Sequence, residues 1–311
     1  MKQTILFLSL SIIGYGQELP TEKTDNHIQV EGTNIFMIPP NSFVPSPNFK
    51  GFQNPKDQTS MIMILEIPGP YLEVSKGFNA EMLKARGMEL KTKKEIKVAT
   101  FDGLLIELDQ AANGMTFSKH ILIYGNEKSS TLINGVSLKD SLALGEKIKE
   151  SVLSTIVDAS LQSNPREALN YSLNERVGAL QFKAVIGNGM LFNRDLKIPT
   201  ESIDKASLIT DKSFAKVAIE NQKLFCISRL KNYPEVYSVI TSKGINEIEI
   251  DSLKGFTLFA KNNENPNEEM YQVILFDTDG GYYIFVGTYL AESEKAVHDI
   301  STIIKTFSRK N

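Results

Sequence analysis

The chain has 311 residues, of which 41% are hydrophobic and 23% are charged, and its formal net charge at pH 7 is −3. This composition is typical of a globular protein that is long enough for two ordinary domains. It excludes a strongly basic surface, so we expect no nucleic-acid partner.

The first predicted element is a secretory signal over residues 1–16. Lys2 provides a positive start, an apolar stretch follows at 5–13, and Gly14 and Gly16 are the small residues that flank a cleavage site. An N-terminal core strand is the less favoured alternative, since a polar segment follows at once. The apolar stretch is shorter than the ~20 residues that span a bilayer. We therefore expect a periplasmic or secreted protein with no stable membrane insertion once the signal is removed.

The first half of the mature chain, 17–157, has the pattern of an α+β domain. A strand at 34–38 ends in a proline-rich loop at 39–55, and the apolar run 60–67 predicts a strand covered on both faces. A helix is expected at 78–86. A meander of four strands and a closing helix complete the half, with the strands at 95–99, 104–108, 117–124 and 130–134 and the helix at 142–156.

A polar linker is predicted at 158–169, and the second half, 170–311, repeats the plan. A hairpin about Gly187-Asn188 opens it, the run 214–219 predicts a buried strand, and a helix is expected at 222–231. The single cysteine, Cys226, lies in this helix among apolar neighbours, which predicts a buried thiol and excludes an intramolecular disulfide. Four strands and a final helix follow, with the strands at 247–250, 256–260, 270–276 and 282–287 and the helix at 292–307.

Internal similarity indicates that the two halves are copies of one unit. Gly103 and Gly255 lie 152 residues apart (255 − 103), and Gly135 and Gly287 have the same separation (287 − 135). At that offset the segment His120-Ile-Leu-Ile-Tyr124 aligns with Gln272-Val-Ile-Leu-Phe276. We therefore predict two similar domains, each an antiparallel sheet flanked by helices and each with its own core.

This order of elements resembles the PsbP-like fold, which is shared by an extrinsic photosystem II subunit and a Ran-binding nuclear transport factor. The strands that contain Gly103 and Gly255, the following strands 121–124 and 273–276, and the closing helices carry the resemblance. Proteins of this fold mostly serve as docking or adaptor modules, so the resemblance implies binding rather than catalysis. It places no functional residue on this chain.

Motifs for catalysis or metal binding are weak. The three histidines are not spaced as zinc ligands, and no serine lies in a GxSxG elbow. His120 begins a strand, where a half-exposed structural residue is favoured over a catalytic base. We therefore expect no catalytic residue, no metal site and no cofactor.

Two charged segments have more than one interpretation. Asp277-Thr-Asp-Gly-Gly281 resembles the start of a calcium loop, but Thr288 stands where a bidentate glutamate would be needed, which favours a hairpin turn. The basic stretch 91–97 has no interleaved aromatic residues, so a solvated strand edge is favoured over a nucleic-acid surface.

Aromatic residues are the best candidates for a contact surface. The loop 39–55 carries Phe43, Phe49 and Phe52 among prolines, and packing of these rings over the sheet is favoured over contact with a partner. Tyr283 and Phe285 belong to an aromatic cluster near the last hairpin, for which core packing is favoured and a contact surface is the alternative. We predict Phe43, Phe52, Tyr283 and Phe285 as ligand or partner contacts.

These features predict an exported, non-catalytic binding or adaptor protein. It would dock on an envelope protein or hold a small hydrophobic or peptide ligand between the repeats. The alternatives are a hydrolase with a site between the two repeats and a structural subunit of an envelope assembly. A hydrolase should bring acids with shifted pKa values together in that place, whereas a binding protein should show aromatic side chains there without such acids.

Overall fold

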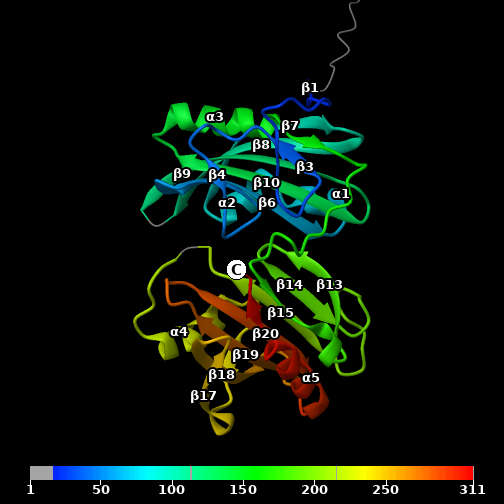
Figure 1. Ribbon diagram of the computed structural model, residues 1–311, viewed down its shortest axis with the longest axis vertical. Coiled ribbons are helices and arrows are strands. Elements are labelled where there is room, and N and C mark those ends of the chain that lie inside the picture. The colour runs from blue at the N-terminus through cyan, green and yellow to red at the C-terminus, as the bar shows by residue number, and fades with distance from the viewer. Residues whose placement is uncertain (1–16, 113, 215, 311) are drawn as a thin grey trace, which may run out of the picture.

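The computed structural model describes residues 17–112, 114–214 and 216–310, and the predicted signal lies outside these ranges. The two halves of the chain are stacked along the long axis of the molecule, each built on one large antiparallel sheet with helices beside it (Figure 1). The protein is therefore an α+β protein with two similar sheets, as the sequence predicts.

The first half contains an eight-stranded sheet of order β1-β7-β8-β9-β10-β6-β5-β4. Its strands are β1 (Gln17–Glu18), β4 (Val44–Pro45), β5 (Gly51–Asn54), β6 (Asp57–Pro68), β7 (Met88–Val98), β8 (Phe101–Ala112), β9 (Met115–Gly125) and β10 (Ser129–Leu138). The helices are α1 (Tyr71–Lys76), α2 (Ala80–Ala85) and α3 (Leu142–Leu153), and β2 (Ile28–Gln29), β3 (Ile35–Met37) and β11 (Ile156–Val157) form a small separate sheet.

Both faces of this sheet are covered, which explains its continuous apolar runs. On β8, Leu105 packs into the cluster beneath α3, which contains Ile148 and Val152. Its neighbours Leu104 and Ile106 point the other way, into the cluster that contains Leu83 of α2. Successive side chains of a strand alternate between faces, so a strand between two apolar layers needs apolar residues at consecutive positions.

The second half contains a sheet of order β13-β14-β15-β20-β19-β18-β16, with β17 also paired to β18. Its strands are β13 (Gln181–Ile186), β14 (Gly189–Asn193), β15 (Ser207–Lys212), β16 (Tyr237–Val239), β17 (Ile245–Ile250), β18 (Leu253–Asn262), β19 (Glu268–Phe276) and β20 (Tyr282–Leu290). The helices are α4 (Gln222–Ser228) and α5 (Glu294–Ile304), with short 3₁₀ turns η1 (Glu175–Val177), η2 (Arg229–Asn232) and η3 (Thr241–Lys243), and β12 (Tyr171–Ser172) pairs with β21 (Ser308–Arg309).

The predicted strand at 214–219 is wrong. The strand lies earlier, at Ser207–Lys212, where β15 pairs with both β14 and β20. Residues 214 and 216–218 are exposed and have no regular structure. The apolar run misled the prediction because β15 contains only two apolar residues, Leu208 and Ile209, and so lacks the continuous pattern of a doubly covered strand.

The order of paired strands is the same in both halves. In the first half β7-β8-β9-β10-β6-β5 are consecutive neighbours, and in the second β17-β18-β19-β20-β15-β14 are the counterparts. The repeated glycines have the same contacts. A Cβ added at Gly135 would lie 2.4 Å from Cγ2 of Ile148, and one added at Gly287 would lie 2.6 Å from Cγ2 of Ile300. In each half the closing helix approaches the sheet too closely for any side chain at that glycine.

One part of the repeat alignment needs correction. Gly103 pairs with Tyr124, but Gly255 pairs with Leu275, so β9 and β19 correspond at an offset of 151 (275 − 124) rather than 152. The side chains agree, because Tyr124 faces the cluster beneath α3 and Leu275 faces the one beneath α5. A one-residue shift moves every side chain of a strand to the other face. The hairpin loops on either side of the strand absorb the shift.

Candidate functional site

The four predicted contact residues lie in the interior, which corrects that prediction. Phe43 and Phe52 are 7% and 1% exposed and belong to the cluster beneath α3. Tyr283 and Phe285 are 1% and 0% exposed and pack beneath α5. Helices and loops cover these four side chains, so they present no surface to a partner. These side chains stabilise the cores.

Phe49, from the same loop, lies at the contact between the halves. Its ring packs edge-on against Phe214, with the ring centroids 6.1 Å apart. Phe49 is 6% exposed, whereas Phe214 is 44% exposed. A phenylalanine that buries another ring while remaining half accessible can add a further apolar contact. The sequence offered a signal for Phe214 in its apolar run, which we had assigned to a strand.

The backbone on each side of this aromatic pair is well fixed. Before β5, the amide of Ile64 donates to the carbonyl of Lys50 at 2.8 Å. Gly51 allows this approach, because a Cβ there would lie 2.0 Å from the carbonyl oxygen of Ile62. After β15, the amide of Ser213 donates to the carbonyl of Tyr282 at 2.9 Å. Both rings therefore stand next to ordered sheet strands.

Polar contacts join the halves beside the rings. The side-chain amide of Asn188, in the β13–β14 turn, donates to the backbone carbonyl of Asn48. Nζ of Lys212 donates to Oδ1 of Asn48 at 3.2 Å, and burial lowers the pKa of Lys212. The predicted turn at Gly187-Asn188 is confirmed, and it forms part of this contact.

A hollow of about 250 Å³ opens at the contact. We call it the inter-repeat groove, and its lining residues are Pro47, Asn48, Phe49, Gln53, Asn54, Pro55, Met61, Phe214 and Lys216. Rings, prolines and a methionine supply apolar surface, amides supply hydrogen-bonding groups, and one lysine supplies charge. The described lining contains no carboxylate and no histidine. Apolar surface with a few polar groups is the usual lining of a ligand-binding site.

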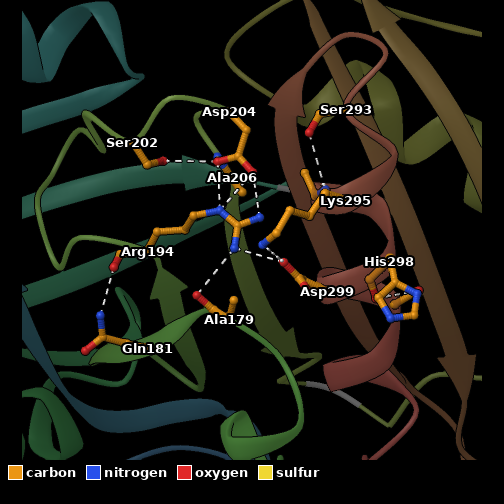
Figure 2. A network of polar contacts seen from close by, with 12 residues as sticks. Ala179, Gln181, Arg194, Ser202, Asp204, Ala206, Ser293, Lys295, His298 and Asp299 are labelled. Carbon is orange, nitrogen blue, oxygen red and sulfur yellow. Dashed lines mark hydrogen bonds and ion pairs between the residues drawn. The ribbon is translucent and has the colours of Figure 1, made fainter.

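A charged network lies elsewhere, between the loop after β14 and helix α5 (Figure 2). Nε of Arg194 donates to both carboxylate oxygens of Asp204 at 2.8 Å, and NH1 lies 2.9 Å from Asp299. These carboxylates hold the pKa of Arg194 above its usual value, chiefly through the hydrogen bond that Arg194 donates to Asp204. The network ties the loop before β15 to the closing helix, and its charges are paired with one another. Its arrangement is that of a structural clamp.

Other candidate groups are inert or dispersed. Cys226 is buried beneath β18 and β19, and burial raises the pKa of its thiol to about 12. The segment 277–281 forms the turn between β19 and β20. Within the described ranges, no group of three or more acids, histidines or cysteines is placed to hold a metal ion. No helix in that part of the chain is long and apolar enough to cross a membrane.

Comparison with known proteins places the likeness at the level of fold. No family model and no curated protein matches the chain. Among solved structures, a protein from Bacteroides thetaiotaomicron VPI-5482 is similar at a TM-score of 0.31 and 13% identity, over 48% of this chain and 52% of that one. The chain thus matches about half the length of that protein.

Two further structures bear on the predicted resemblance. Cyanobacterial PsbP from Synechocystis sp. PCC 6803 is similar at a TM-score of 0.32 and 10% identity, over 48% of this chain and 98% of that one. The immunity protein TplEi of the T6SS of Pseudomonas aeruginosa has a TM-score of 0.32 and 10% identity, over 92% and 97% of the two chains. PsbP has the fold that the sequence pattern resembles, and at these TM-scores and identities no property of these proteins is carried over to this chain.

Proposed function

We propose that this protein is a non-catalytic binding protein that receives an extended, apolar segment of another protein in the inter-repeat groove. The observation that carries the proposal is the composition of the groove, which combines two phenylalanines, two prolines and a methionine with amide side chains and no acid. The exported location predicted from residues 1–16 would make an envelope protein the source of that segment.

The groove offers the groups that an extended chain requires. Oε1 of Gln53 accepts from Ser46, and Oδ1 of Asn54 accepts from the amide of Lys56. Their side-chain NH2 groups donate no hydrogen bond to any described residue, so they can meet the carbonyl groups of a bound chain. The exposed half of Phe214 would cover an apolar side chain, and Lys216 favours a nearby acid.

The hydrolase alternative would need acids in this place. An enzyme that cleaves a bound segment requires a group to activate water or a nucleophile within reach of the scissile bond. The described lining of the inter-repeat groove has no acid and no histidine, and its one ionisable residue is Lys216. The structural-subunit alternative would need a large apolar face, whereas the groove is small and partly polar.

The test is binding to an array of twelve-residue peptides with a central Phe, Leu or Met, with and without flanking acids, followed by fluorescence anisotropy. We expect apolar-centred peptides to bind, and Phe214→Ala to weaken them about 5- to 30-fold, as for a contact residue at an interface. Ile203→Ala is the matched control, because Ile203 is 94% exposed and lies outside the groove. Equal affinity in both variants, or cleavage of the peptide, would overturn the proposal.

A further inference from the structure

A second hollow, of about 180 Å³, lies in the first half between the sheet and the first turn of α3. We call it the α3 hollow. Unlike the inter-repeat groove, it is lined mostly by charged and polar residues of β8, β9 and β10. Those that carry the argument are Glu107, Asp109, His120, Ser137, Lys139 and Gly145.

In the second half, the position equivalent to the α3 hollow is filled by core side chains. There Phe259 and Tyr271 stand opposite each other on β18 and β19, as Glu107 and His120 do on β8 and β9. The two rings stack with centroids 4.8 Å apart. Across the next pair of strands His120 meets Gly135 and Tyr271 meets Gly287, so the two places are equivalent.

Two more positions differ in the same direction. Ser137 follows Gly135 by two residues on β10, where Tyr289, which is 1% exposed, follows Gly287 on β20. On the closing helices Gly145 corresponds to Val297, which packs against the core beneath α5. The first half therefore has Glu, His, Ser and Gly where the second has Phe, Tyr, Tyr and Val. The smaller and more polar set leaves the α3 hollow open.

Two residues that line the hollow each have a buried polar atom without a partner among the described residues. These atoms are Nδ1 of His120 and Oγ of Ser137. His120 is 7% exposed, so the prediction of a half-exposed histidine is wrong. A buried polar atom without a hydrogen bond is destabilising, so a ligand that satisfies it gains affinity. Oγ of Ser137 lies 3.3 Å from a Cβ placed at Gly145, and the other ring nitrogen of His120, Nε2, lies 3.9 Å from it.

The wall of the hollow carries both signs of charge. Asp109 lies 2.7 Å from Nζ of Lys139 and 3.5 Å from Nζ of Lys91. Glu107 lies 2.7 Å from Nζ of Lys149. The N-cap residue of α3, Ser141, makes no side-chain capping bond, so the first turn of the helix presents amide donors beside the lysines.

From this arrangement we infer that the α3 hollow binds a small zwitterion of the size of a free amino acid. Its carboxylate would meet Lys139 and the first turn of α3, and its ammonium group would meet Asp109 and Glu107. Nδ1 of His120 and Oγ of Ser137 would complete the hydrogen bonds. A ligand of one charge alone would pair only with the lysines or only with the carboxylates of the wall. The groups of the other sign would gain no contact from it. This site is separate from the inter-repeat groove and does not depend on the function proposed for it.

Isothermal titration calorimetry with glycine, alanine, serine, glutamate and γ-aminobutyrate tests the inference, with acetate and ethylammonium as ligands of one charge. We expect at least one zwitterion to bind at least 10-fold more tightly than either single-charge ligand. No heat from any zwitterion at 10 mM would overturn the inference. Acetate binding as tightly as the zwitterions would also overturn it, since the hollow would then be an anion site.

Substitutions in the α3 hollow test whether the ligand binds there. The double substitution His120→Tyr with Ser137→Tyr copies the filling of the second half and should abolish binding. Ser137→Ala leaves the packing almost unchanged and should weaken binding about 3- to 10-fold, which keeps the test decisive if the double variant does not fold. Tyr289→Phe is the matched control in the second half and should bind as the natural protein does. Unchanged affinity in Ser137→Ala and in a folded double variant would place the ligand elsewhere and refute the site.

Discussion

The substitution Gly135→Ala tests the close approach of helix and sheet that the two halves share. The added Cβ would lie 2.4 Å from Cγ2 of Ile148 and 3.1 Å from Cγ2 of Val152. Both of these side chains are 0% exposed and cannot move aside into solvent. Forcing an extra methyl group into a packed core costs about 1–3 kcal/mol. We expect the first half to lose that much stability.

A double-mutant cycle identifies the cause. Ile148→Ala alone should cost about 2–5 kcal/mol, but it removes the methyl group that Gly135→Ala meets. The two substitutions together should therefore cost less than their sum by about 1–2 kcal/mol. Gly145→Ala is the control, because its nearest neighbour is Ser137 Oγ at 3.3 Å and alanine favours the helix.

The assay is urea denaturation followed by far-UV circular dichroism, fitted with one transition for each half because the halves have separate cores. Gly145→Ala should be neutral or stabilising. If Gly135→Ala leaves both midpoints unchanged, or if its cost adds fully to that of Ile148→Ala, the close contact does not explain the glycine.

Three further predictions concern single groups. Burial lowers the pKa of His120. As the pH drops below ~6.5, the unfolded chain takes up a proton before the folded protein does, so the stability present above that pH should fall. His120→Asn should reduce this change of the urea midpoint between pH 7 and 5, whereas the exposed His298→Asn should not. Arg194→Met should cost about 1–3 kcal/mol by thermal denaturation, against less than ~0.5 kcal/mol for exposed Lys197→Met, and equal costs would contradict the clamp. Because burial raises the pKa of Cys226 to about 12, its thiol should react with a disulfide reagent at pH 8 only after urea is added, and rapid labelling of the native protein would contradict this.

Much of the fold was predictable because it rests on local patterns. The meander and closing helix of each half appear at the expected positions, since apolar runs and turn residues mark them. The glycine pairs Gly103/Gly255 and Gly135/Gly287 marked the repeat. Each glycine lies where a neighbouring strand or helix leaves no room for a side chain. The offset of β19 was not predictable, because two loop-length differences cancel along the sequence.

The site was predicted less well than the fold. Phe43, Phe52, Tyr283 and Phe285 are aromatic, and the sequence alone does not show whether such residues meet the core or a partner. The distinction depends on covering elements that come from distant segments. The α3 hollow was hidden for a related reason, since it arises from polar and small residues on three strands and a helix. Only the pairing of β8, β9 and β10 brings them together.

Hydrogen exchange of the whole protein, free and saturated with the tightest peptide of the array, tests most directly that a partner segment binds between the repeats. Amides in 47–54 and in 207–214, on opposite sides of the inter-repeat groove, should both exchange more slowly in the complex, while 88–98 on the distant sheet edge should not change. Slower exchange in one half alone, or in neither flank of the groove, would contradict the account.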